Sequence, residues 1–326
     1  MKQIAVLGDG AWGTALALVL ERAGHKVTLW SHFPEHAEEM RRTRENVKYL
    51  PGVPLPTGIA VVSGAPPRSD FYIAAVPTQF IRPTFTELTP YLPKKAVLVC
   101  VAKGLEQSTG KRPTEILREV LGGVRLVALS GPSHAPEVAR GLPASVVVAG
   151  ESRAAKATQM LFAGSSLRAY TTKDALGVEL AGALKNVIAL AAGISDGLGA
   201  GYNAKAALLT RGIVEMARLG VALGARERTF FGLSGIGDLI TTTTFPSGRN
   251  LTVGRALGEG KKLDEVLGSM HSVAEGVWST KAVLALAKKH GIPMPITEQV
   301  HAILFEGKPA REAVRDLMKR DQTAET

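Results

Sequence analysis

The amino-acid sequence predicts an α/β protein: an N-terminal, mostly parallel sheet with helices on both faces, followed by an all-helical C-terminal domain. Two observations lead to this prediction. Short apolar runs alternate with helical segments through the first half of the chain, which is the pattern of a parallel sheet. Beyond residue 175 no further strand pattern appears. We therefore place the first domain at residues 1–175 and the second at residues 176–326.

Composition is that of a globular protein. The 326 residues are enough for two separate cores, and 45% hydrophobic and 21% charged residues are ordinary values. The N-terminal MKQIAVLG has a short apolar stretch before a glycine turn, which indicates a strand and not a secretory signal. No apolar run has the ~20 residues of a membrane span. The single cysteine, Cys100, lies in the apolar run AVLVCVA, as expected for a core residue of a cytoplasmic protein.

The net charge of +10 has two interpretations, a nucleic-acid surface or the handling of small polyanions. Lysines and arginines are scattered without a basic run, and aromatic residues are few at 5%, so bases would find little to stack on. This favours a small anionic substrate and argues against nucleic acid. The seven histidines show no paired metal-ligand spacing, so we expect no metal.

The first element is a strand at residues 2–7, and a glycine-rich turn and a helix follow it. Gly8, Gly10 and Gly13 fit the spacing G-x-G-x-x-G, and the next strand, KVTLW, covers residues 26–30. Between a strand and a helix, this spacing is a strong dinucleotide signal, because it permits the tight turn and the approach of a pyrophosphate to the helix N-terminus. The first domain is therefore predicted to be Rossmann-like and dinucleotide-binding.

The end of the second strand bears on the choice between NAD and NADP. Trp30 is followed by Ser31 and His32, and the first acid is Glu35. Without an acid directly after the strand, there is room for the 2′-phosphate of NADP. His32 is either a contact to that phosphate or an ordinary loop residue, and the sequence leaves NADP or NAD open.

The remaining strands of the first domain are expected at 59–62, 71–77, 95–104, 125–133, 144–150 and near 167–171. Helices are expected between them near 78–89, 112–121 and 152–163. Ligands collect beyond the carboxyl ends of such strands. Two groups lie at strand ends, Lys103-Gly104 and Gly131-Pro132-Ser133. Each is either part of a site or an ordinary turn.

The second domain is expected to contain helices at 174–196, 203–222, 233–243, 249–258, 277–290, 295–306 and 309–320. Asp174 can cap the first of these. Between Ala181 and Ile194 only Lys185 and Asn186 are polar, and a helix that is apolar all round is a buried one. Lys185 is therefore predicted to be buried, with a lowered pKa and a functional role. The alternative is a lysine that extends to water.

Two polar clusters interrupt the helical half. In GIGDLITTTTFPSGRN, at residues 235–250, Arg249 and Asn250 open a helix, so backbone amides, a guanidinium and an amide could converge on one phosphate. The alternative is an arginine on a solvated loop. In HSVAEGVWST, at residues 271–280, Glu275-Gly276 precedes a helix and indicates little more than its start.

Six motifs in order now carry a family likeness: GDGAWGTALA at 8–17, KGLE at 103–106, GPSHA at 131–135, LAGALKN at 180–186, GDLITT at 237–242 and SGRN at 247–250. Together with residues 192–212, they resemble NAD(P)-dependent glycerol-3-phosphate dehydrogenase over essentially the whole chain. The resemblance implies a cleft between a Rossmann domain and a helical substrate domain. It also implies interconversion of dihydroxyacetone phosphate and sn-glycerol 3-phosphate, which supplies phospholipid synthesis.

The resemblance also implies roles for single residues. Lys185 matches the catalytic lysine, and Lys103 matches a second active-site lysine that contacts substrate and cofactor. Further substrate contacts match Gly131, Ser133, Asp238, Thr242, Gly248, Arg249 and Asn250. Cofactor contacts match Gly8, Gly10, Ala11, Trp12, Gly13, His32, Ala135, Arg249, Val273 and Glu275.

One position departs from the family pattern. Where bacterial members often read Ser-Arg-Asn, this chain reads Gly248-Arg249-Asn250, so a hydroxyl is lost. Ser247 or a backbone amide could replace it.

The expected chemistry follows from ketone reduction. Hydride transfer leaves negative charge on the carbonyl oxygen, which a protonated Lys185 can stabilise and then protonate. Burial and the charge of Lys103 would lower the lysine pKa, and Asp238 would hold the ammonium in place if it lies close.

Two rival functions remain at this point: a keto-acid or opine-type reductase, and a regulatory protein that only senses NADP. A homodimer is a further expectation.

Overall fold

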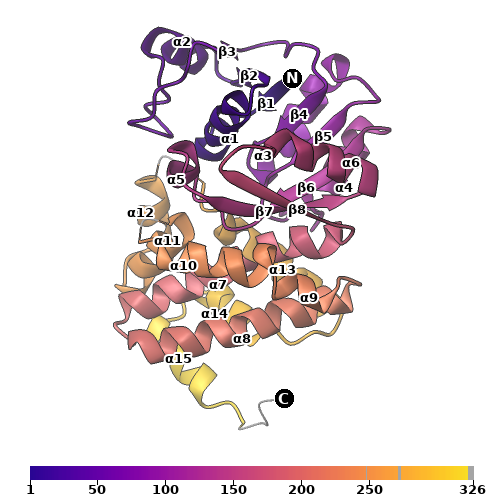
Figure 1. Cartoon of the computed structure of the whole chain (residues 1–326). Helices are drawn as coiled ribbons and strands as arrows, with labels where there is room; N and C mark the ends of the chain where they lie inside the picture. Colours follow the sequence, from indigo (N-terminus) through magenta and orange to yellow (C-terminus); the bar gives the residue numbers. More distant parts are fainter. Residues whose placement is uncertain (247, 271–272, 322–326) are drawn as a thin grey trace.

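The computed structural model describes residues 1–246, 248–270 and 273–321 (Figure 1). Its sheet has the order β3-β2-β1-β4-β5-β6-β7-β8, and every neighbouring pair is parallel except β6 and β7. The strands are β1 (Gln3–Leu7), β2 (Lys26–Trp30), β3 (Ile59–Val62), β4 (Phe71–Ala74), β5 (Val97–Cys100), β6 (Arg125–Ser130), β7 (Ala144–Gly150) and β8 (Leu167–Thr172). The prediction of a mostly parallel sheet is confirmed.

Helices cover both faces of the sheet because its strands are apolar on both sides. Ile4 and Val6 of β1 share one core with α1 (Ala11–Arg22), α2 (Pro34–Thr43), α5 (Ala135–Ala139) and α6 (Ser152–Gln159). Ala5 and Leu7 share the other with α3 (Thr78–Leu88) and α4 (Pro113–Leu121). Cys100 is buried there, and burial raises the pKa of its thiol. It is a core residue, as predicted.

Three strands are shorter than the sequence predicts. β4, β5 and β6 end at Ala74, Cys100 and Ser130, so the residues that follow are loops. Lys103 and Gly131 therefore lie on connections beyond the carboxyl ends of neighbouring parallel strands, where both can reach the same space.

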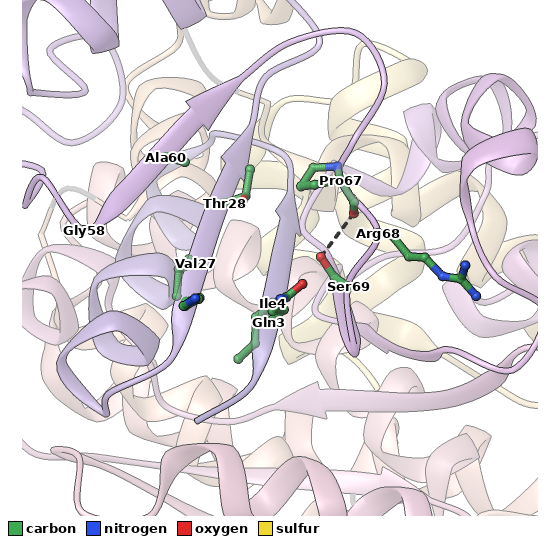
Figure 2. Close-up of a pocket in the computed structure, with 10 residues that line it drawn as sticks. Gln3, Ile4, Val27, Thr28, Gly58, Ala60, Pro67, Arg68 and Ser69 are labelled. Atoms are coloured by element: carbon green, nitrogen blue, oxygen red, sulfur yellow. Dashed lines mark hydrogen bonds between the residues drawn. The ribbon is translucent and has the colours of Figure 1, made fainter.

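A shallow hollow of about 400 Å³ lies on the sheet near the amino ends of β1 and β2 (Figure 2). Gly58 and Ala60 border it on one side, and the segment Pro67–Ser69 on the other. The Ser69 hydroxyl donates to the Pro67 carbonyl oxygen at 3.1 Å, and Arg68 points away from the strands (Figure 2). The glycine turn lies at the opposite end of β1.

The second half is helical, as predicted, and surrounds α7 (Ala175–Gly197) (Figure 1). Asp174 caps α7 by accepting from the Gly177 amide at 3.0 Å. The other helices are α8 (Gly201–Ala222), α9 (Glu227–Phe230), α10 (Asp238–Thr244), α11 (Arg249–Gly258), α12 (Leu263–Gly268), α13 (Glu275–Lys289), α14 (Pro295–Phe305) and α15 (Ala310–Met318). A π-helical turn at Leu233–Gly237 precedes α10. The short α9 and α12 were not predicted.

Helices α7 and α11 touch backbone to backbone. A Cβ on Gly193 of α7 would lie 2.2 Å from the Leu251 carbonyl oxygen, and one on Gly254 of α11 would lie 2.1 Å from the Leu190 carbonyl oxygen. Any larger residue would push the helices apart. The glycine contact therefore holds α11 against the C-terminal third of α7, beyond Lys185 and Asn186.

By length and composition α7 could cross a membrane, but 89% of its most apolar window is buried inside the protein. It is the core helix of the second half. The described strands end at Thr172 and only helices follow, whereas the division of the chain at residue 175 stays a prediction.

Candidate active site

The glycine turn after β1 is tightly packed and requires Gly8 and Gly13. Gly8 has a φ of +121°, and a Cβ there would lie 2.7 Å from the Ala75 carbonyl carbon. A Cβ on Gly13 would lie 2.0 Å from the Gly8 carbonyl oxygen. The turn is therefore as tight as the spacing predicts, and it brings the start of α1 to the carboxyl end of β1.

The N-terminus of α1 is open to an anion. Its N-cap is Gly10, no side chain caps it, and no acid lies in its first turn. The Trp12 indole Nε1–H is buried without a partner among the described residues. Ala11, Trp12 and Ala135 pack against the same core, so α5 borders the turn. Unpaired donors at a helix start fit the pyrophosphate of a dinucleotide.

The end of β2 has a neighbour that we did not predict. His32 is half-exposed, and its Nδ1 lies 3.9 Å from Oε2 of Glu87 on α3. A carboxylate here would oppose a 2′-phosphate beside His32. Ser31 is fully buried and bonded to Phe33, so its side chain is not available to a ligand.

The start of α13 reaches the loops of the sheet. Glu275 Oε1 accepts from the Thr78 amide, at the start of α3, at 2.7 Å. Burial raises the pKa of Glu275, and the bond from Thr78 opposes this. Val273 is half-buried two residues earlier. Glu275 therefore joins the helical half to the β4–α3 turn.

Lys185 is buried, as predicted, within a cluster of charged groups. Its side chain is 7% exposed, and its Nζ lies 3.2 Å from Asp238 Oδ1. The Nζ also donates to the Thr242 hydroxyl. Lys103 Nζ lies 2.6 Å from the other oxygen, Oδ2, of Asp238. A carboxylate that is 4% exposed thus holds two ammonium groups together.

Lys185 has one donor to spare. An ammonium carries three N–H groups, and two of them point at Asp238 and Thr242. The third has no partner among the described side chains and backbone groups. A ligand oxygen can therefore accept it.

Burial and neighbouring charges bring the pKa of Lys185 close to neutral pH. Burial lowers the pKa of Lys185 to about 8, Asp238 opposes that shift, and Lys103 and Arg249 add to it. Burial also disfavours the charged form of Asp238, but Lys103 and Lys185 outweigh it and hold the pKa of the carboxyl below its usual range. The cluster therefore combines a carboxylate with an ammonium that loses its proton readily.

The loop after β6 closes on Lys103. The Gly131 carbonyl oxygen accepts from Lys103 Nζ at 3.1 Å and from the Ser133 hydroxyl at 2.9 Å. The Lys103 stem packs against Gly182 of α7, where a Cβ would lie 3.4 Å from Lys103 Cγ, an ordinary van der Waals contact. The two strand-end groups predicted from the sequence thus meet at one point.

Asn186 links the cluster to the start of α11, which sequence reasoning missed. Its amide donates to the Lys103 carbonyl oxygen at 2.9 Å, and its carbonyl accepts from Asn250 at 3.0 Å. Asn250 in turn accepts from the Gly276 amide at 3.0 Å. As the second polar residue of an apolar helix, Asn186 gave the same signal as Lys185.

The N-terminus of α11 is a second open helix end. Its N-cap is Gly248 without a side-chain cap, and Arg249 is exposed beside it. A Cβ on Gly248 would lie 3.0 Å from the Thr242 carbonyl oxygen, so a serine would fit only after a small shift. The suggested replacement hydroxyl, Ser247, lies outside the described residues.

Within the described ranges, no group of three or more His, Cys, Asp and Glu side chains could hold a metal ion.

Comparisons with known proteins agree with this geometry. Residues 3–156 match the family model for the NAD-dependent glycerol-3-phosphate dehydrogenase N-terminus, and residues 174–315 match the model for its C-terminus. A glycerol-3-phosphate dehydrogenase [NAD(P)+] of Geobacillus kaustophilus is 51% identical, over 100% of this chain and 96% of its own.

Two further relatives bear the same name. The protein of Geobacter sp. strain M21 is 49% identical over 99% of both chains. The crystal structure of glycerol-3-phosphate dehydrogenase from Coxiella burnetii superposes with a TM-score of 0.94. It is 40% identical and covers 98% of this chain and 99% of its own.

Proposed function

The chain belongs to the NAD-dependent glycerol-3-phosphate dehydrogenase family, and from this premise we propose that it interconverts dihydroxyacetone phosphate and sn-glycerol 3-phosphate with NADP or NAD. The observation that carries the proposal is the spare N–H of Lys185, on a buried ammonium whose pKa is lowered to about 8. A keto-acid reductase and a cofactor sensor lose their support at this point, because the relatives over the full chain are glycerol-3-phosphate dehydrogenases.

Lys185 has two tasks in this proposal. Bound NAD(P)H supplies the hydride that reduces the carbonyl carbon. The spare N–H of Lys185 hydrogen-bonds the carbonyl oxygen and then transfers its proton to that oxygen, leaving a neutral amine. In the reverse direction the neutral amine takes the proton of the alcohol. A pKa near 8 suits both directions near neutral pH.

Asp238 and Thr242 orient the lysine. Because both accept hydrogen bonds from Nζ, the remaining N–H is held in one direction. Lys103 shares Asp238 and adds positive charge where negative charge develops on the substrate. Asn186 and Asn250 keep Lys103, α7 and α11 together through direct hydrogen bonds.

The substrate phosphate lies at the start of α11 in this proposal. The uncapped amides after Gly248 and the guanidinium of Arg249 are donors suited to a phosphate. At the other end, the open start of α1 fits the dinucleotide pyrophosphate. The product would supply phospholipid synthesis in the cytoplasm, and a homodimer stays a prediction.

The assay follows the oxidation of NADPH and NADH with dihydroxyacetone phosphate, unphosphorylated dihydroxyacetone and a 2-keto acid. We expect turnover with the phosphorylated ketone and very little with the others. Arg249→Ala should raise the KM for dihydroxyacetone phosphate by about 10- to 100-fold and change the poor activity on dihydroxyacetone little. Faster turnover of the keto acid, or equal losses with both ketones, would contradict the proposal.

A further inference from the structure

A second hollow, of about 370 Å³, lies where β8, α6 and the segment before α9 meet. All four of its charged lining residues are basic: Lys156 of α6, Lys173 after β8, Arg226 at the N-cap of α9 and Arg228 within α9. Ser152, Thr171 and Thr172 also line it, and no acidic residue does. Two stretches of the chain, residues 152–173 and 226–228, thus bring these cations to one concave surface.

The charges of these cations are not neutralised by neighbouring side chains. Within the described residues, no ion pair or side-chain hydrogen bond joins Lys156, Lys173, Arg226 or Arg228 to an acid. This differs from the cluster at Lys185, where Asp238 holds both lysines. Converging cations without acids repel one another, so an anion that binds among them relieves that repulsion.

The nearby acids are occupied elsewhere. Glu151 accepts from the Arg153 and Ala154 amides and thereby caps α6, so the start of that helix is not open. Asp174 is buried and accepts from the Arg226 amide at 2.9 Å and from the Thr229 hydroxyl. Glu227 lies between the two arginines in sequence but is exposed and does not line the hollow.

The hollow is separate from the candidate active site. β8 lies at the edge of the sheet, five strand positions from β1 and its glycine turn, or about 24 Å at the usual strand spacing. Along α7, Lys185 lies ten residues beyond Ala175, or about 15 Å at the helical rise. One small ligand therefore does not fill both sites.

We propose that this hollow is a binding site for a small molecule that carries two phosphate groups. One phosphate ester carries about −1.5 to −2 charges at neutral pH, so two match four basic side chains. Arginine guanidinium groups bind phosphate oxygens in a bidentate manner, and hydroxyls and ammonium groups supply further donors. The volume is near the lower end of small-molecule pockets, roughly 300–1,000 Å³. The proposal does not depend on the catalysed reaction.

The test titrates the full chain with inorganic pyrophosphate by calorimetry, at constant ionic strength and with saturating NADPH to occupy the glycine turn. We expect one saturable site that binds pyrophosphate at least about tenfold more tightly than orthophosphate. The double variant Lys173→Gln/Arg226→Gln should weaken pyrophosphate by about tenfold or more. The double variant Lys156→Gln/Arg228→Gln should weaken pyrophosphate binding to the same extent. It provides the test if the first variant does not fold.

The matched control is Lys94→Gln/Lys95→Gln, which removes two exposed cations away from the hollow and should leave the affinity within about twofold. Arg249→Ala should also leave it unchanged. The proposal is overturned if the wild type shows no saturable binding, if the folded hollow variants bind as tightly as the wild type, or if the control loses as much. A loss confined to Arg249→Ala would assign pyrophosphate to α11 and overturn it too.

Discussion

Helix α7 carries two buried charged side chains, Glu179 and Lys185, whose surroundings differ in kind. Glu179 is 3% exposed and accepts from Arg112 Nη1 at 2.5 Å, the Thr114 amide at 2.8 Å and the Thr114 hydroxyl at 2.6 Å. All these donors belong to the start of α4. This carboxylate is therefore closed off by the fold and ties α7 to the first half of the chain.

Lys185, six residues further along α7, has one N–H without a partner among the described residues. Two of its three N–H groups have partners, a second lysine lies across the same carboxylate, and burial lowers its pKa to about 8. Burial raises the pKa of Glu179, and Arg112 and Thr114 oppose that shift with their charge and hydrogen bonds. Three donors thus hold the carboxylate of Glu179, whereas Lys185 keeps one N–H without a partner among the described residues. Burial alone therefore does not separate the two charges, and the proposed role of Lys185 rests on its unpaired N–H.

The largest expected effect comes from Lys185→Met, which keeps the length of the side chain and removes its charge and proton. Turnover of dihydroxyacetone phosphate should fall by at least about 10²–10⁴-fold. NADPH affinity should stay within about twofold, because the glycine turn does not involve α7. Steady-state kinetics check the turnover, and a cofactor titration checks the affinity. Near-normal turnover would show that Lys185 takes no more part in the reaction than Glu179 does.

Stability should respond in the opposite sense to the usual loss of a buried residue. Because the pKa of Lys185 falls from 10.5 to about 8 on folding, its charge costs on the order of 3 kcal/mol below pH 8. The folded state binds fewer protons than the unfolded chain between pH 8 and 10.5, so this cost disappears as pH rises through that window. The melting temperature of Lys185→Met at pH 7 should therefore equal or exceed that of the wild type.

Glu179→Ala removes the carboxylate that Arg112 and Thr114 bind. In contrast to Lys185→Met, it should lower stability and leave turnover nearly unchanged. It leaves the buried Thr114 donors without their acceptor and takes the buried partner from Arg112, which keeps only Glu115, at a cost of about 3–5 kcal/mol. Denaturant unfolding measures this cost. Turnover well below the melting temperature should stay within about threefold. Glu115→Ala is the matched control, since Glu115 contacts the same arginine from a more exposed position and should cost only about 1 kcal/mol.

The smallest expected effect concerns a pair outside both clusters. Glu87→Gln removes the exposed carboxylate 3.9 Å from His32 and should improve the ratio of kcat/KM for NADPH over NADH by up to about fivefold. High salt should reduce the difference, because exposed charges are screened. An unchanged ratio at low salt would show that the 2′-phosphate does not lie near His32.

The spacing of apolar residues and glycines along the sequence predicts part of the fold and of the candidate site. The all-round apolar texture of α7 predicts that Lys185 is buried, and the glycine spacing predicts the tight turn after β1. The short helices α9 and α12, of four and six residues, contain too few turns for a period to show.

Local pattern does not predict contacts between distant residues, and only the family resemblance placed Lys103, Lys185 and Asp238 in one site. Glu275 meets Thr78 across 197 positions, and Lys103 meets Asp238 across 135. Which loops share a space depends on strand order and helix packing, and neither is encoded in local spacing. Glu87 was missed for this reason, since it reaches His32 from α3.

The most direct test of the central claim, that Lys185 donates the proton, is the pH dependence of kcat/KM for dihydroxyacetone phosphate reduction. The wild type should lose activity as pH rises through about 8, because the protonated lysine is the active form. Lys103→Met removes a like charge and should move this fall in kcat/KM to higher pH. Asp238→Asn removes the attracting charge and should move it to lower pH. We predict that the pH at which kcat/KM falls moves in opposite directions in the two variants. If that pH is the same as in the wild type in both variants, the account is contradicted.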